Sequence, residues 1–179
     1  MTRSFPGRRQ ILSVIAILFA VSWSLAPAWS QGTTTGASGL PVPRFVSLKS
    51  DRVNVRVGPS REHAVAWTFV QSGLPVEIIQ EFENWRRIRD WEGKVGWVFH
   101  SLLSGRRTAL VTPWEKTNRT PLRARSKSDA DIVAELEPFV LTSVTECAGG
   151  WCRVNGTEYE GWLDQTRLFG VYPDEILED

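Results

Sequence analysis

The chain carries one pattern of residues twice, at a separation of 65 to 67 positions. Val55-Arg56 returns as Leu122-Arg123 after 67 residues, and two later segments return after 66 and 65 residues: Trp85-Arg86-Arg87-Ile88 as Trp151-Cys152-Arg153-Val154, and Gly96-Trp97-Val98 as Gly161-Trp162-Leu163. Repetition at a near-constant spacing is typical of copies of one structural unit. We therefore expect two similar units, residues 45–111 and 112–179. The falling separation predicts that the second copy has lost one residue in each of two turns.

Both units consist of short runs in which apolar and polar residues alternate. Val53-Asn54-Val55-Arg56-Val57 ends at Gly58-Pro59-Ser60, and Trp67-Thr68-Phe69-Val70 ends at Ser72-Gly73. Alternation with a period of two is typical of half-buried strands, and clusters of Gly, Pro and Ser are typical of turns. No segment of eleven or more residues has the periodicity of a helix. The pattern predicts an all-β fold, with a small sandwich or barrel in each unit.

Residues 1–30 have the layout of a secretory signal peptide. A basic start with three arginines precedes the apolar run 11–21, and small residues follow around Ala28 and Ser30. This layout predicts cleavage after Ala28 or Ser30, and retention as a membrane anchor is the alternative, although the run is short for a span. Residues 31–44, rich in Gly, Thr, Ser and Pro, are expected to form a flexible linker. The mature protein is therefore predicted to be periplasmic or secreted.

The chain has two cysteines, Cys147 and Cys152. Disulfides persist in oxidising compartments, so export favours a bridge between them. The four residues between them include Gly149 and Gly150, which suits a hairpin whose last cross-strand pair is bridged. A unit of this size buries only about 60% of its unfolded surface, so that a cross-link helps to stabilise it. The loop is small, and the chain-entropy model gives about 2 kcal/mol for the bridge.

Charge is distributed unevenly along the chain. Residues 44–112 hold 11 basic and 7 acidic side chains, whereas residues 113–179 hold 7 and 13. Because neither part is strongly basic, we do not expect nucleic acid as a partner. The opposite net charges indicate that the two units attract each other or that each faces a different ligand, and ordinary surface charge is the third interpretation.

The first unit resembles the bacterial SH3 domain. Its segments VNVRVGPS (53–60), WRRIR (85–89) and GKVGWV (93–98) are similar to the opening, the central strand and the closing strand of that family. The second unit keeps PLRARS, GGWCRV and EGWL but lacks the Gly-Pro pair. Together, residues 45–173 resemble the exported tandem SH3-like proteins of Gram-negative bacteria. The resemblance implies a partly open SH3-like barrel of roughly five to seven strands per unit. It also implies a binding role toward peptidoglycan or its peptide cross-links, without catalysis.

Two polar clusters have the composition, but not the setting, of a catalytic site. Ser60, Glu62 and His63 are neighbours in one turn, whereas the members of a catalytic triad normally come from different elements. Asp90 and Glu92 flank Trp91, and on the exposed turn expected there both carboxylates stay ionised, which does not suit a general acid. The histidines and cysteines lack the spacing of metal ligands. We expect no enzymatic activity and no cofactor or metal.

Aromatic residues interspersed with arginines predict a binding surface instead. Small β-barrels recognise extended peptides on aromatic grooves or at an open sheet edge, and arginine pairs with carboxylates such as those of a stem peptide. The predicted ligand is peptidoglycan or an extended envelope peptide, and the predicted contacts are Trp67, Trp85, Arg87, Arg89, Trp91 and Phe99. The alternative is a structural adaptor that docks an envelope protein.

Alternation and the repeat distinguish the tryptophans in residues 85–97. Ile88 is the natural core residue of its strand, which leaves Trp85, Arg87 and Arg89 on the outer face. Trp85 and Trp97 return in the second unit and are expected to serve the shared architecture. Trp91 aligns with Gly156 and does not return. We therefore expect Trp91 to contact the ligand first, and packing against the other unit is the alternative.

Overall fold

The computed structural model describes residues 1–2 and 34–178, so the expected signal segment and its cleavage sites lie outside the described residues. Among the described residues, no helix is long and apolar enough to cross a bilayer. Strands dominate this part of the chain, and its helical elements are the short 3-10 helices η1 (His100–Leu102) and η2 (Gln165–Arg167). The all-β fold that the alternating pattern predicts is confirmed.

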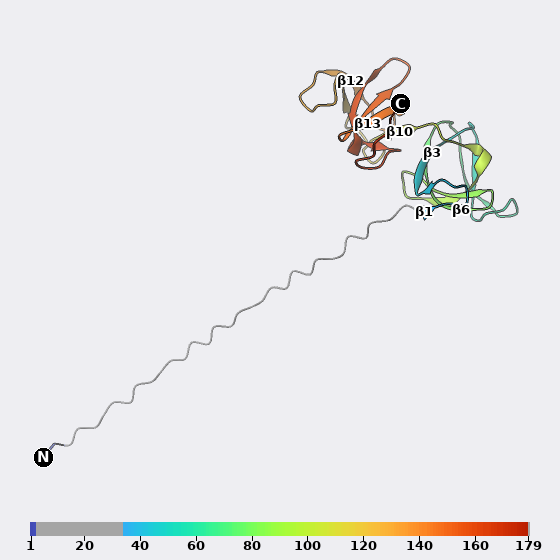
Figure 1. Ribbon diagram of the computed structural model, residues 1–179, viewed down its shortest axis with the longest axis horizontal. Coiled ribbons are helices and arrows are strands. Elements are labelled where there is room, and N and C mark those ends of the chain that lie inside the picture. Colours follow the sequence, from blue (N-terminus) through green and yellow to red (C-terminus); the bar gives the residue numbers. More distant parts are fainter. Residues whose placement is uncertain (3–33, 179) are drawn as a thin grey trace. The chain divides into compact units, whose positions relative to one another are not determined.

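The first repeat forms a seven-stranded antiparallel sheet in the order β5-β4-β8-β7-β6-β3-β9, drawn in blue to green in Figure 1. The strands are β3 (Arg44–Leu48), β4 (Val53–Arg56), β5 (Val65–Phe69), β6 (Pro75–Phe82), β7 (Trp85–Arg89), β8 (Val95–Phe99) and β9 (Leu103–Ser104).

The second repeat forms a seven-stranded sheet in the equivalent order β12-β11-β15-β14-β13-β10-β16. Its strands are β10 (Thr108–Val111), β11 (Thr120–Arg123), β12 (Ile132–Leu136), β13 (Leu141–Ala148), β14 (Trp151–Asn155), β15 (Glu160–Asp164) and β16 (Leu168–Phe169).

The two sheets share their pairing register as well as their strand order. Arg56 lies opposite Trp97, and Arg123 lies opposite Trp162, each directly after a register shift. The turn before β6 spans residues 70–74, and its equivalent before β13 spans only 137–140. The turn before β8 spans residues 90–94, and its equivalent before β15 spans only 156–159. The predicted loss of one residue in each of two turns is therefore confirmed, and the turns are located.

Each repeat has its own core, formed by alternate residues of its strands. Val55, Ile88 and Val98 are fully buried in the first repeat, as are their equivalents Leu122, Val154 and Leu163 in the second. Gly96 allows β8 to cross β4 closely, because a Cβ atom there would lie against the Val55 side chain and 3.1 Å from the carbonyl oxygen of Arg56. The prediction that Ile88 faces the core is confirmed.

The segment before β3 is folded against the first repeat, which contradicts the flexible linker expected over residues 31–44. Within it, β1 (Thr34–Thr35) pairs with β2 (Pro41–Val42), and the Val42 side chain is buried. Ser38 donates from its backbone N–H and its hydroxyl group to the Glu81 carboxylate, both at 2.7 Å. Composition alone predicted a linker because it does not reveal an acidic anchor 43 residues away.

Glu81 is nearly inaccessible and forms ion pairs with two arginines. Arg44 lies 2.7 Å from its carboxylate and Arg86 lies 3.2 Å away. Burial raises the pKa of Glu81, but the hydrogen bonds from Ser38 and Arg44 and the charge of Arg86 outweigh this effect and lower it to about 2. The carboxylate is therefore ionised at neutral pH and holds the β1–β2 hairpin to β6.

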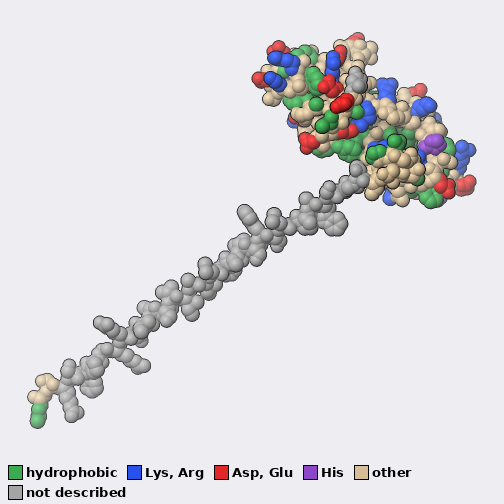
Figure 2. Space-filling model, in the orientation of Figure 1, with side chains coloured by type: hydrophobic (Ala, Val, Ile, Leu, Met, Phe, Trp, Pro, Cys, Tyr) green, Lys and Arg blue, Asp and Glu red, His purple; other side chains and the backbone are tan. Residues whose placement is uncertain are grey.

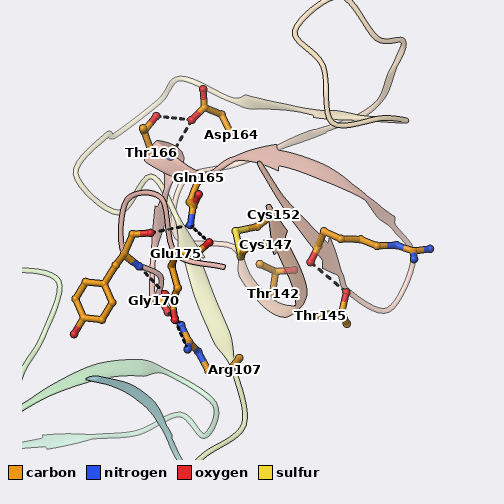
Figure 3. Close-up of a disulfide and its surroundings, with 12 residues drawn as sticks. Arg107, Thr142, Thr145, Cys147, Cys152, Asp164, Gln165, Thr166, Gly170 and Glu175 are labelled. Atoms are coloured by element: carbon orange, nitrogen blue, oxygen red, sulfur yellow. Dashed lines mark hydrogen bonds and ion pairs between the residues drawn. A yellow bond between two sulfur atoms is a disulfide. The ribbon is translucent and has the colours of Figure 1, made fainter. Parts of the chain in front are cut away.

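The predicted disulfide joins Cys147 and Cys152 on the paired strands β13 and β14 (Figure 3). Gly149 and Gly150 form the turn with φ of 58° and 82°, values that glycine adopts without strain. Ala148 and Trp151 form a further cross-strand pair between the bridge and the turn. The bridge thus spans the second pair from the turn, not the last pair as expected, because the glycine turn is only two residues long.

The second repeat starts earlier than the expected boundary between residues 111 and 112. Strand β10 ends at Val111 and pairs with β13 and β16 of the second sheet. The corresponding first strand, β3, occupies the same place in the first sheet. These two strands carry no repeated motif, so sequence comparison did not detect them.

The two repeats contact each other within the unit Gly32–Asp179. The Phe45 ring lies 4.8 Å from that of Tyr172, measured between centroids. The Tyr172 hydroxyl donates to the Glu77 carboxylate at 2.9 Å, and Arg89 donates to the other oxygen of Glu77. Burial, reinforced by the Glu77 charge, raises the pKa of Tyr172, which keeps this hydroxyl a hydrogen-bond donor.

Candidate functional site

Trp85 and Phe99 form the aromatic base of a groove on the outer face of the first repeat. The two residues lie opposite each other on β7 and β8, with ring centroids 5.4 Å apart in an edge-to-face arrangement. Alternation places Trp85 on the face away from Ile88, as predicted. Phe99 and its surroundings nevertheless leave only 8% of Trp85 exposed. Trp85 is thus a buried floor rather than an open platform.

Arginines from separate segments surround this aromatic pair. The groove has a volume of about 280 Å³ and is lined by Arg52, Asn54, Arg56, Arg61, Trp85 and Phe99, with Ser101 and Leu102 of η1. We call it the first groove. Arg61 lies over the Phe99 ring, 5.7 Å from its centroid. Arg56 donates to the carbonyl oxygen of His63 at 2.6 Å, which fixes the loop that carries Arg61.

The charges in the first groove are unbalanced. None of Arg52, Arg56 and Arg61 forms an ion pair with any residue that the structure describes, and no acidic residue lines the groove. Guanidinium groups bind carboxylates with charge-assisted and often bidentate hydrogen bonds. An aromatic floor adds contact area at little entropic cost. The arrangement suits an anionic group on an extended ligand.

Two predicted arginines lie on β7 outside this groove. Arg87 is exposed and donates to Gln80 at 3.4 Å, a long hydrogen bond. Arg89 donates twice to one oxygen of Glu77, at 2.6 and 2.8 Å. Arg89 therefore joins the contact between the repeats and is committed to an intramolecular partner.

Trp67 and Trp91 lie in a row of aromatic side chains away from the first groove. The row runs from Trp67 through Phe69 to Trp91 and then to Phe139 of the second repeat, with centroid distances of 6.1, 5.9 and 6.4 Å. Trp67 and Trp91 are partly buried against the first core, and the indole nitrogen of each is buried without a hydrogen-bond partner among the described residues. Trp91 thus packs toward the other repeat, which is the alternative that the sequence left open.

The three groove arginines were not among the predicted contacts, although a signal for two of them exists. Alternation places Arg52, Asn54 and Arg56 on the outer face of β4, because Val53 and Val55 are buried. Arg61 comes from the β4–β5 loop, whose path cannot be predicted from a local pattern. Of the six predicted contacts, the structure brings only Trp85 and Phe99 into this groove.

The polar clusters have structural settings. Ser60 Oγ lies 2.9 Å from His63 Nδ1 within one exposed loop, and no described carboxylate orients the other ring nitrogen. Asp90 differs from the expectation of an exposed turn, since it is 4% exposed and burial raises its pKa. Its carboxylate accepts the N–H groups of Glu92 and Lys94 and so closes the turn. Within the described residues, no group of three or more His, Cys, Asp and Glu side chains could hold a metal ion.

The largest cavity of the described chain, about 540 Å³, lies elsewhere in the second repeat between the start of β13 and the β14–β15 turn. It has no counterpart among the cavities of the first repeat. A hollow equivalent to the first groove, of about 190 Å³, is instead present in the second repeat beside Trp151. Because only this position is hollow in both copies, we take the first groove as the candidate site.

Comparisons with known proteins agree with this architecture. Two solved structures from Trichomonas vaginalis are similar to the chain: NlpC2, at 11% identity and a TM-score of 0.32, and NlpC1, at 12% and 0.33. The matches cover 71% and 75% of this chain but 48% of each of those chains, so this chain spans about half of their length. Scores this low carry no weight for fold or function. No curated protein matches the chain.

The family comparison is decisive. Residues 49–105 and 116–170 each match the bacterial SH3 domain, together well over half of the chain. These segments coincide with the two seven-stranded sheets, and no catalytic domain is identified. The protein belongs to the bacterial SH3 domain family, with two such domains in tandem.

Proposed function

We propose that the protein is a non-enzymatic binding module of the cell envelope, exported by its N-terminal segment, that recognises carboxylate groups of an extended peptide in peptidoglycan. Bacterial SH3 domains typically bind cell-wall components, which supports the class of ligand. The observation that carries the proposal is the first groove, in which Arg52, Arg56 and Arg61 surround Trp85 and Phe99 without an acidic neighbour.

The chemistry of the first groove favours a peptide over a bare glycan. Neutral sugars offer hydroxyl groups, and these do not compensate three guanidinium charges. A stem peptide combines carboxylates with an extended backbone, which suits charge-assisted hydrogen bonds beside an aromatic floor. Exposed charges are screened by salt, with a Debye length of about 10 Å at 0.1 M. Binding through this groove should therefore weaken as salt is added.

Cosedimentation with purified sacculi tests the proposal. The exported form of the protein should pellet with intact sacculi at low salt and less so at moderate salt. Sacculi from which an amidase has removed the stem peptides serve as the matched control and should retain little protein. Equal pelleting with intact and stripped sacculi would place recognition on the glycan. Absence of pelleting at every salt concentration would exclude the cell-wall ligand.

A structural adaptor remains the second candidate, and the sheet edges favour it. Strands β5 and β12 each end their sheet. On β12, Ile132 and Val133 are 52% and 53% exposed. An open edge with exposed β-branched residues can pair with a strand of another protein. Crosslinking in envelope extracts should then give a protein adduct that Val133→Lys abolishes while sacculus binding persists. An adduct that survives this substitution would rule out the edge.

A further inference from the structure

The second repeat has a hollow in the same position as the first groove, which we call the second groove. It is lined by Arg123, Ser128, Trp151, Asp164 and Arg167, with Thr120 and Pro121. The match extends to individual hydrogen bonds. Arg56 donates to the carbonyl oxygen of His63 at 2.6 Å, and Arg123 donates to that of Ala130 at 2.7 Å, 67 residues later in both cases. The two hollows are copies of one site.

One exchange at the aromatic base changes the chemistry of the copy. Trp85 lies opposite Phe99 in the first groove, and Trp151 lies opposite Asp164 in the second. A carboxylate thus replaces an aromatic ring directly beside the tryptophan. In the β4–β5 loop and its copy, Ser128 takes the position of Arg61 and removes one positive charge.

The two arginines of the second groove are already engaged, in contrast to those of the first. Arg123 is directed at the Ala130 carbonyl group, and Arg167 forms an ion pair with Glu115 at 2.7 Å. Asp164 is exposed, and a single oxygen of its carboxylate accepts both the N–H and the hydroxyl group of Thr166 (Figure 3). Its second oxygen has no hydrogen-bond partner among the described residues. The group available for a ligand is therefore an anion.

We infer that the second groove binds a primary ammonium group on an extended peptide, between the Trp151 ring and the free oxygen of Asp164. An ammonium group is attracted both by the face of a tryptophan and by a carboxylate, and the two attractions act together at one point. The inference rests on the proposed function, since it gives the two domains different chemical points of one envelope peptide. The first domain takes a carboxylate and the second an amine.

A neutral-capped lysine peptide tests this inference. Acetyl-Gly-Lys-Gly-amide carries one ammonium group and no carboxylate, and the same peptide with an acetylated lysine side chain is its uncharged control. In a titration followed by NMR, the lysine peptide should shift the Trp151 indole N–H signal. The acetylated peptide should bind at least about tenfold more weakly, as expected for the loss of one charge-assisted contact.

Asp164→Asn is the matching protein variant, because its amide oxygen can still accept from Thr166 while the charge is removed. It should weaken the lysine peptide about tenfold. Asp131→Asn, which removes an exposed acid of the same repeat outside the groove, should change nothing. Equal binding of the two peptides to the unmodified protein, or no shift at millimolar peptide, overturns the inference without relying on any variant.

The outcome separates this inference from the proposed function. If sacculi pellet the protein but the lysine peptide does not shift Trp151, the second groove has no ammonium site and the proposed function stands. If the lysine peptide binds at Trp151 but sacculi pellet nothing, the site exists and the envelope ligand is wrong.

Discussion

At the scale of single residues, the three tryptophans in residues 85–97 have three different roles. Trp85 forms the floor of the first groove, and Trp97 lies partly exposed on β8 opposite Arg87 and Arg56. Trp91 extends from a turn that Asp90 closes and packs between Phe69 and Phe139. Its lack of a counterpart in the second repeat therefore accompanies a contact between the repeats.

Replacing Trp91 with alanine should destabilise the protein and leave the first groove intact. Removing a partly buried tryptophan that packs on the core costs about 2 to 3 kcal/mol, below the usual range for a fully buried one. Urea unfolding measures this loss. Trp114→Ala is the control, because that side chain is 55% exposed and should change stability by less than about 0.5 kcal/mol. Unchanged stability with lost sacculus binding would make Trp91 a ligand contact instead.

At the scale of elements, the β1–β2 hairpin depends on the ionised Glu81. Its pKa of about 2 lies below the ordinary value of 4.5, so its contribution to stability is present above pH 4.5 and is lost as the pH falls toward 2. The free energy of unfolding should fall over this window by an amount on the order of 3 kcal/mol.

Glu81→Gln removes this ionisation and should flatten that part of the pH profile measured by urea unfolding. Glu135→Gln changes an exposed acid on β12 and should leave the profile as it is. An unaltered profile in the Glu81 variant would mean that the acid sensitivity comes from other carboxylates.

The bridged hairpin of β13 and β14 should contribute modestly to stability. The disulfide closes a loop with a sequence separation of 5, for which the chain-entropy model gives about 2 kcal/mol. The double variant Cys147→Ala/Cys152→Ala should lose about this much, measured in urea without reductant. Adding reductant should lower the stability of the parent protein and not that of the variant. Sensitivity of the variant to reductant would show that the effect does not come from the bridge.

Strands with a strong local pattern could be predicted from the sequence, and those without one could not. Alternation and the repeat identify β4, β7, β8 and their copies, because their buried residues recur at a fixed period. The strands β3 and β10 carry no shared motif, and they are positioned by long-range pairing with β6 and β13. The folded segment 34–44 depends on the distant Glu81, which no local pattern reveals.

The candidate site was only partly predictable for the same reason. Strand alternation places Trp85 on the outer face, and it also places Arg52 and Arg56 there. The loop that brings Arg61 over Phe99 is fixed by the hydrogen bond from Arg56 to His63, a tertiary contact. The burial of Trp85 likewise depends on its cross-strand neighbour.

At the scale of the whole molecule, the two domains are joined by buried contacts, and charges of both signs are interspersed on the face shown in Figure 2. The hydrogen bond from Tyr172 to Glu77 connects the domains at 2.9 Å. Tyr172→Phe should therefore lower the free energy of unfolding by about 1 kcal/mol, since it keeps the ring and removes the donor.

Tyr159→Phe is the matched control in the same domain. The Tyr159 hydroxyl is buried without a partner among the described residues, so its removal should not destabilise the protein. Equal losses of stability in urea for the two variants would mean that the Tyr172 hydroxyl contributes nothing specific to the contact between the domains.

Binding of groove variants to intact sacculi tests the central claim most directly. Arg52→Ala/Arg61→Ala removes two exposed arginines of the first groove. Arg106→Ala/Arg125→Ala removes two exposed arginines outside it, with the same change in net charge. The account predicts that the groove variant binds sacculi at least about tenfold more weakly while the control pair binds like the parent protein. Equal binding by both variants, with both folded, would contradict it.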